Sequence, residues 1–154
     1  MVMKKIIHGR IHFVKYLLIV LLLTACGSSS KEDPAVTRYR DDMAVCAENI
    51  KSIAASIDAI DPSAADAPAQ LLSNIDRMRD RFNEMSALAA PEAYGSASKL
   101  AVEAATLMND CSTLYHTAYD AAVYDSLSAE QAQKQYENAM QRLSSIGEIL
   151  METK

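Results

Sequence analysis

The chain has 154 residues, a formal net charge of −5, three cysteines, and hydrophobic side chains at half of its positions. All 20 acidic residues but only 11 of the 15 lysines and arginines follow residue 25, so that part of the chain carries a net charge of about −9. Such an acidic segment repels nucleic-acid phosphates, which argues against a direct role in DNA or RNA binding.

The first 25 residues predict a signal peptide. Basic side chains lie at positions 4, 5, 10 and 15 and precede the uncharged segment 16–23. Eight helical residues rise only about 12 Å, whereas crossing a hydrocarbon core takes roughly 20 residues. A basic start followed by a short apolar run is typical of an export signal.

The end of this segment, Leu23-Thr24-Ala25-Cys26, resembles the lipobox of bacterial lipoproteins. The resemblance implies that a diacylglycerol is attached to the Cys26 thiol and that signal peptidase II cleaves before Cys26. The alternative is an uncleaved anchor, or a conventional cleavage site beside an incidental cysteine. By the resemblance, residues 26–33 are a lipidated cysteine and a flexible linker, whose seven residues after Cys26 reach at most about 23 Å.

The remaining segment, residues 34–154, is expected to form one helical domain. Apolar residues recur in steps of three and four over segments near 34–60, 69–90, 92–125 and 129–152, a spacing that keeps one stripe of each helix facing a partner. No period-two alternation indicates a strand. The stripe positions are Val36, Tyr39, Met43, Cys46, Ile50, Ile53, Ile57 and Ile60; Leu71, Ile75, Met78, Phe82, Met85 and Ala89; Ala97, Ala101, Ala104, Met108, Cys111, Tyr115, Ala118 and Ala122; and Ala132, Tyr136, Ala139, Leu143, Ile146 and Leu150.

Prolines and capping residues mark the predicted helix starts and connections. Pro34 and Pro62 each follow an aspartate, the type of residue that caps a helix N-terminus. Ser128-Ala129-Glu130-Gln131 has the spacing of a capping box and predicts the start of the last helix. Short connections make sequential helices antiparallel neighbours, so we predict an all-α, up-down-up-down antiparallel four-helix bundle. A three-helix bundle with a frayed second segment is the alternative.

Two cysteines occupy stripe positions at similar heights. Cys46 and Cys111 lie on the first and third predicted helices, which run parallel in this topology. Export permits oxidation, so the sequence favours a disulfide between them, against the alternative of two small buried thiols.

The sequence offers few groups for catalysis or cofactor binding. His116 is the only histidine after residue 25, too few for a site built on several imidazoles, and no glycine-rich phosphate loop or nucleophile elbow is present. We therefore expect no catalytic residues, no metal, no cofactor and no enzymatic activity. The methionines are expected to pack in the core, and the segment 77–81 is expected to form an exposed ion-pair face with neighbouring acidic residues.

One group of side chains remains as a candidate site. Tyr115 and Tyr119 share a helical face beside His116, and Tyr136 enters from the start of the last helix. This arrangement predicts a tyrosine-rich end of the bundle that serves either as a ligand or partner surface or as a polar cap of the core.

The segment Ala89-Ala90-Pro91-Glu92-Ala93-Tyr94 is similar to stretches in small helical lipoproteins without an assigned role. Together with the lipobox, this resemblance implies a lipid-anchored protein on the outer face of the cell membrane, or on the outer membrane of a diderm because Gly27 follows Cys26. We expect a non-enzymatic binding or interaction module with another envelope protein or a small ligand as its partner. The alternatives are an accessory ligand-binding subunit for a transport or signalling partner, and an enzyme.

Overall fold

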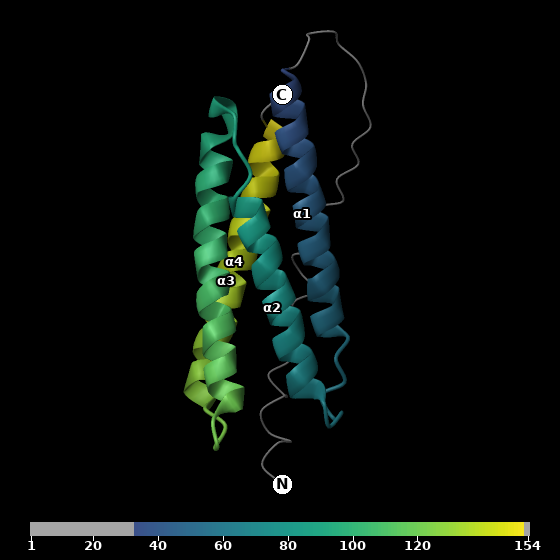
Figure 1. The fold of residues 1–154 in the computed structure, drawn as a ribbon, viewed down its shortest axis with the longest axis vertical. Coiled ribbons are helices and arrows are strands. Elements are labelled where there is room, and N and C mark those ends of the chain that lie inside the picture. Colours follow the sequence, from purple (N-terminus) through teal and green to yellow (C-terminus); the bar gives the residue numbers. More distant parts are fainter. Residues whose placement is uncertain (1–32, 153–154) are drawn as a thin grey trace. The chain divides into compact units, whose positions relative to one another are not determined.

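The computed structural model describes residues 33–152, and in this range the chain is all-helical. Its elements are α1 (Pro34–Asp58), α2 (Ala67–Ser86), the short 3-10 helix η3 (Glu92–Tyr94), α3 (Gly95–Asp120) and α4 (Ser126–Glu152) (Figure 1). The predicted four-helix bundle is confirmed. The three-helix alternative is wrong, because the second segment forms a continuous helix of 20 residues.

Consecutive helices run antiparallel (Figure 1). The connections 59–66 and 121–125 therefore lie at one end of the bundle, here called the loop end. Helices α3 and α4 pack together most extensively, followed by α2 with α3 and α1 with α2, whereas α1 and α4 approach each other at few positions. None of the helices within residues 33–152 combines the length and hydropathy needed to span a membrane.

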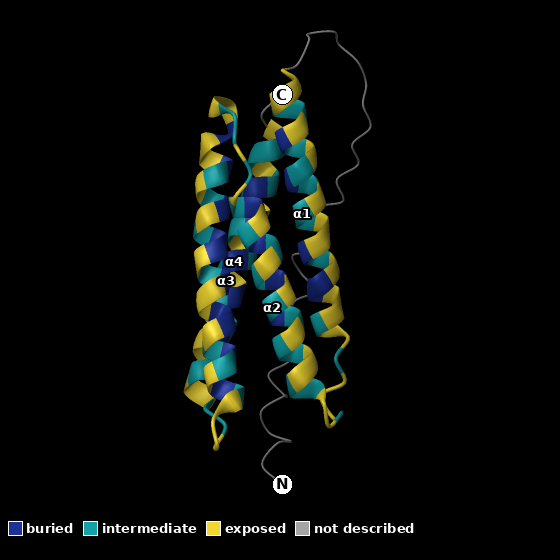
Figure 2. Cartoon of the chain, in the orientation of Figure 1, coloured by how far each residue is buried: buried dark blue, intermediate teal, exposed yellow. Residues whose placement is uncertain are grey.

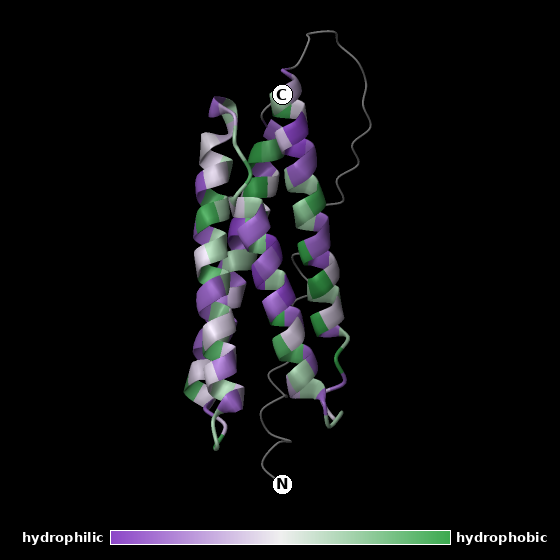
Figure 3. Cartoon of the chain, viewed as in Figure 1, coloured by the Kyte–Doolittle hydropathy of each residue, from purple (hydrophilic) through white to green (hydrophobic). Residues whose placement is uncertain are grey.

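The predicted stripes form the core. Buried residues follow the inward faces of all four helices, and hydrophobic residues lie on the same faces (Figures 2 and 3). Alanines such as Ala101 and Ala104 on α3 and Ala139 on α4 are fully buried. Small side chains at these positions let the two helix backbones approach closely, which accounts for the extensive α3–α4 packing. Ala89 and Ala122, two predicted stripe residues, are instead exposed, because both lie beyond the ends of their helices.

The start of α1 is formed as the sequence predicts. The Asp33 carboxylate accepts a hydrogen bond from the Ala35 backbone N–H at 2.9 Å, and Pro34 occupies the first turn. Asp61, in the next Asp-Pro pair, lies in the α1–α2 connection, where its carboxylate accepts bonds from the Ser63 backbone N–H (2.9 Å) and hydroxyl (2.8 Å). The second pair therefore stabilises a turn, and α2 begins five residues after Pro62.

Helix α2 ends at Ser86, earlier than the predicted residue 90. The Ala87 backbone N–H donates to the carbonyls of Asn83 and Glu84 at 3.2 Å each, and the Ser86 hydroxyl donates to the same Asn83 carbonyl at 2.8 Å. Residues 87–91 are irregular, and Pro91 disfavours helical backbone at Ala90.

Beyond the end of α2, Tyr94 of η3 fills the core. Its side chain is fully buried, and its ring centroid lies 5.5 Å from that of Tyr39 on α1. The Tyr39 hydroxyl is itself buried and has no hydrogen-bond partner among the described residues.

The α3–α4 connection also differs from the prediction. Helix α3 ends at Asp120 and α4 begins at Ser126, where residues 125 and 129 were expected. The Asp125 carboxylate accepts bonds from the backbone N–H groups of Leu127 (3.0 Å) and Ser128 (3.3 Å) and from the Ser128 hydroxyl (2.7 Å). Asp125, not Ser128, therefore caps α4, since a carboxylate placed just before the first turn accepts from two open N–H donors.

Candidate functional site

The tyrosines predicted to gather at one end of the bundle do lie together at the loop end. The Tyr115 and Tyr119 ring centroids are 6.3 Å apart, and Tyr119 lies 5.2 Å from Tyr124. Tyr136 of α4 is close enough to Tyr115 to influence its ionisation. Tyr115 and Tyr136 are only 7% and 6% exposed, whereas Tyr119 and Tyr124 are half-buried. The inner two tyrosines close the core, and only the outer two reach the surface.

The tyrosine hydroxyls are held as neutral hydrogen-bonding groups. The Tyr115 hydroxyl donates to Gln133 Oε1 of α4 at 2.9 Å. Burial raises the pKa of Tyr115 and Tyr136 far above the ordinary value, and burial beside Tyr124 raises the pKa of Tyr119 to about 12. These phenols stay protonated near neutral pH, so they do not supply a base.

His116 lies at the centre of a polar network that joins α2 to α3. The network consists of Asp76 and Arg79 on α2 and Ser112, His116 and Asp120 on α3. His116 Nε2 lies 3.1 Å from Asp76 Oδ2, and Nδ1 lies 3.1 Å from Asp120 Oδ2. Asp76 Oδ1 accepts from the Ser112 hydroxyl (2.7 Å) and from Arg79 Nη1 (3.1 Å).

The two carboxylates around the imidazole favour its charged form. An imidazole satisfies two acceptors only when both ring nitrogens carry protons. The hydrogen bonds to Asp76 and then to Asp120 accordingly raise the pKa of His116. Burial alone would raise the pKa of Asp76, but the bonds from Ser112 and His116 and the charge of Arg79 outweigh burial and lower it.

The network contains the residue types of a hydrolase triad in a different geometry. A nucleophilic serine donates its proton to the histidine, which a carboxylate orients from the other side. Here the Ser112 hydroxyl donates to Asp76 and is 2% exposed, and the imidazole is flanked by carboxylates on both sides. A histidine held in this way is a poor general base.

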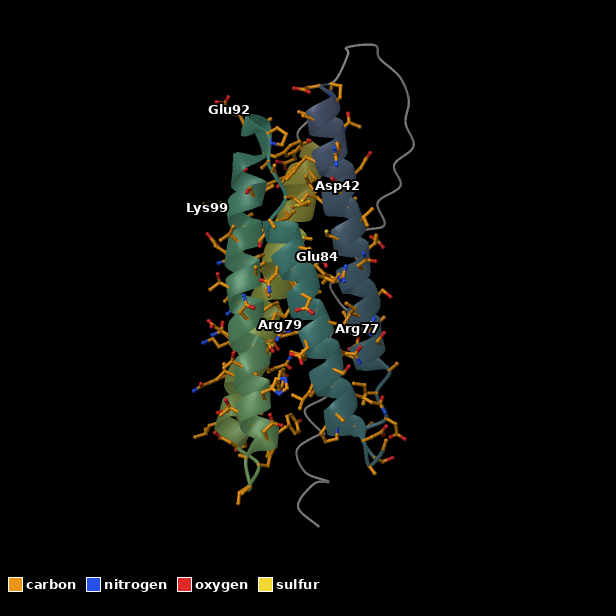
Figure 4. All side chains as sticks on the ribbon, in the orientation of Figure 1. Asp42, Arg77, Arg79, Glu84, Glu92 and Lys99 are labelled. Atoms are coloured by element: carbon orange, nitrogen blue, oxygen red, sulfur yellow. The ribbon has the colours of Figure 1, made fainter. Side chains whose placement is uncertain are left out.

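Sequence reasoning identified His116 but not the side chains that surround it. The spacing Ser112–His116–Asp120 places three polar groups on one face of α3, and this signal is visible in the sequence. Asp76 and Arg79 lie about 40 residues earlier and were assigned to the exposed ion-pair face. That face is present, with Arg79–Asp80 at 2.9 Å and an Arg81–Glu84 pair, but Arg79 also reaches toward α3 and donates to the Ser112 hydroxyl at 3.2 Å (Figure 4).

The two cysteines of the bundle are free thiols in the structure, which does not contain the predicted Cys46–Cys111 disulfide. Cys46 is half-buried on α1, and its pKa is raised by burial and by the nearby Glu84 of α2. Cys111 is fully buried near Tyr136 of α4, and burial raises its pKa to about 12. The thiols thus face different neighbours, α2 for Cys46 and α4 for Cys111.

Stripe methionines lie in the core, as expected: Met43, Met78, Met85 and Met108 are at most 1% exposed. Within the described part of the chain, no group of three or more histidine, cysteine, aspartate or glutamate side chains could hold a metal ion.

Two shallow hollows lie away from the tyrosines. One, of about 250 Å³, lies between α1 and α2 and includes Ile53, Arg77 and Arg81 in its lining. The other, of about 320 Å³, lies between α3 and α4 beside Val102 and Leu107, and the ion pair between Arg142 and Glu103 (3.0 Å) lies along it.

Cys26 and the lipobox lie outside the described residues. Comparisons of the chain with protein-family models, with curated proteins and with solved structures found no match.

Proposed function

We propose that this chain is a cell-envelope lipoprotein, held to the outer face of a membrane by a lipid on Cys26, and that its helical bundle is a non-enzymatic interaction module. The observation that carries the anchor is the order of features at the N-terminus: basic residues, a short apolar run, Leu23-Thr24-Ala25-Cys26 and a polar spacer. Two acyl chains suffice for stable membrane anchoring, whereas one gives only marginal binding.

The position of α1 supports a short tether. Its first helical residue, Pro34, follows Cys26 by eight residues, and Asp33 already caps the helix. The tethered end of the bundle would therefore stay within about 23 Å of the lipid. Helix α3 is 26 residues long, or about 39 Å, so the loop end would project well away from the bilayer.

The loop end is the surface that we assign to a partner. Val123 and Leu127 are 82% and 69% exposed, and the half-buried rings of Tyr119 and Tyr124 lie beside them in sequence. Residues 119–127 are here called the tip. Aliphatic and tyrosine side chains grouped in this way favour contact with a protein surface. The partner would be another protein of the cell envelope.

The chemistry of the candidate site supports a binding role over catalysis. His116 is engaged by two carboxylates, and the Ser112 hydroxyl is buried and donates to Asp76. The alternative of an accessory ligand-binding subunit would need space among Tyr115, Tyr119 and Tyr136. The burial of Tyr115 and Tyr136 in the core weighs against a ligand at that place.

The anchor is tested by substituting Cys26→Ser and following the protein through cell fractionation, with Cys46→Ser as the matched control. We expect the C26S variant to leave the membrane fraction and to lose the mass of its acyl groups, while C46S behaves as wild type. Recovery of C26S with the membranes, and a wild-type mass without acylation, would refute the anchor.

The interaction surface is tested by placing a photo-crosslinking residue at Val123 or Leu127 in living cells. Val45, which is 61% exposed on α1, provides a control position of similar character away from the tip. We expect one discrete adduct with the same envelope protein from both tip positions and none from Val45. Equal adducts from all three positions, or none, would contradict the assignment of the tip.

A further inference from the structure

The polar network reaches the last residue of α3. Asp120 ends the helix, where the macrodipole places partial negative charge and makes a carboxylate unfavourable. His116 lies one turn earlier, and its imidazolium supplies the positive charge that this terminus favours. The His116–Asp120 contact therefore stabilises the final turn of α3 only while the imidazole is protonated.

The charged groups around His116 come from two helices. Asp76 approaches from α2, where Arg79 lies on the other oxygen of the same carboxylate, and Asp120 approaches from α3 itself. On α4, Gln133 accepts from the Tyr115 hydroxyl and donates to Glu137 at 3.0 Å, and Tyr136 lies near Tyr115. Among the charged groups of the described residues, however, only Asp76 and Asp120 shift the pKa of His116. Protonation of His116 is thus governed by two carboxylates.

Loss of the proton forces one of the two contacts to break. A neutral imidazole has one N–H and one lone pair, and a lone pair 3.1 Å from a carboxylate oxygen is repelled. Asp76 is fixed by Ser112 and Arg79, whereas the Asp120 side chain is 68% exposed and can turn into solvent. The neutral tautomer therefore keeps its N–H on Asp76 and releases Asp120.

The last turn of α3 in turn holds the tip. The Asp125 backbone N–H donates to the Ala118 carbonyl at 3.2 Å, and the Tyr119 ring contacts Tyr124 at a centroid distance of 5.2 Å. Fraying of residues 117–120 would remove both contacts. We propose that His116 is a pH-sensitive latch for the tip: its protonated form fixes the last turn of α3 and residues 121–125, and its neutral form releases Asp120 and loosens them.

The sign of the effect follows from the shifts. The pKa of His116 is raised from 6.5, so its contribution is complete below about pH 6.5 and is lost as the pH rises through the raised value. The pKa of Asp76 is lowered from 3.8, so the contribution of Asp76 is present above about pH 3.8 and is lost in stronger acid. The latch is therefore closed between these limits and opens on the alkaline side.

Hydrogen exchange of the full chain in detergent, read by mass spectrometry at about pH 5.5 and about pH 8, tests the proposal. After correction for the intrinsic exchange rate, we expect peptides covering residues 117–125 to lose protection about two- to fivefold at the higher pH. His116→Gln and Asp120→Asn should each abolish this difference. Asp110→Asn, which makes the same charge change at an exposed position of α3, should retain it.

Two outcomes would overturn the latch. One is equal corrected protection of residues 117–125 at both pH values in the wild-type chain. The other is a pH-dependent change in the protection of residues 117–125 that is as large in D120N as in the wild type. The D120N variant keeps every other residue of the polar network. The result does not depend on the proposed function, since the exchange of the tip is measured in detergent, without a membrane or a partner protein.

Discussion

Replacing Tyr39 with phenylalanine removes one buried hydroxyl from the core while keeping the aromatic ring. Tyr39 is 4% exposed, its ring packs against Tyr94 at 5.5 Å, and its hydroxyl has no hydrogen-bond partner among residues 33–152. Burial, with a smaller contribution from Tyr94, raises the pKa of this phenol. The ring therefore stabilises the core by packing, whereas the buried hydroxyl without a partner destabilises it.

The expected effect is a gain in stability. A buried polar group without a partner costs about 1–3 kcal/mol, and the substitution removes that cost at the loss of one packed oxygen atom. We expect a net increase of about 1 kcal/mol in the free energy of unfolding. For a helical unit of this size, the increase corresponds to a rise of about 3–5 °C in Tm.

Urea and thermal unfolding followed by circular dichroism at constant pH measure the change. Tyr115→Phe is the matched control, because it deletes the same atom from a hydroxyl that donates to Gln133 at 2.9 Å. The control should lose about 1 kcal/mol, the typical contribution of one hydrogen bond. The two Tyr→Phe substitutions should therefore change stability in opposite directions.

A Tyr39→Phe variant that is destabilised as much as Tyr115→Phe would refute this reasoning. Such a result would mean that the Tyr39 hydroxyl has a partner in solution. Equal unfolding slopes in urea for both variants and the wild type are required for the comparison, since a changed slope indicates a changed unfolded state.

Two further predictions concern the thiols and the cap of α4. In the folded protein, a maleimide should label Cys46 and leave Cys111 unreacted until urea unfolds the bundle. The reason is that Cys111 is fully buried and its pKa is raised to about 12. If neither cysteine is labelled in non-reducing denaturant, the two form a disulfide. Asp125→Ala should lower the Tm at neutral pH, and the difference from wild type should shrink as the pH falls below about 4. The reason is that hydrogen bonds from Ser128 and Leu127 lower the pKa of Asp125 from 3.8. The stabilisation by this carboxylate is therefore present above that pH and is lost when it is protonated. A Tm difference that stays the same in acid would show that the carboxylate is not the cap.

The helical faces could be read directly from the sequence. Apolar residues in steps of three and four identify the side of each helix that must leave water, whatever its neighbours are. Ile50, Phe82, Met108 and Ile146 were placed on stripes and are all buried. Asp33 was also recognised as a cap. A capping side chain bonds a backbone N–H only two or three residues further along the chain, so the pattern is visible in the sequence.

The helix ends in alanine-rich parts could not be read in the same way. Alanine fits both a helix and the connection that follows it, so Ala89 and Ala122 extended the predicted stripes beyond the true ends. The start of α4 depends on a side chain that fills open backbone N–H groups, which is that of Asp125. The sequence analysis placed the start of this helix at Ser128 from its capping-box spacing, and only the three-dimensional arrangement showed that Asp125 is the cap.

By itself, the sequence determined the class of fold and the inward face of each helix, because both depend on local composition and spacing. Only the tertiary structure decided that Asp76 meets His116 and that Tyr94 packs against Tyr39. These contacts depend on how far one helix is rotated and shifted along another. That geometry is fixed by the packing of the whole core, which places residues 40 or 55 positions apart within bonding or stacking distance.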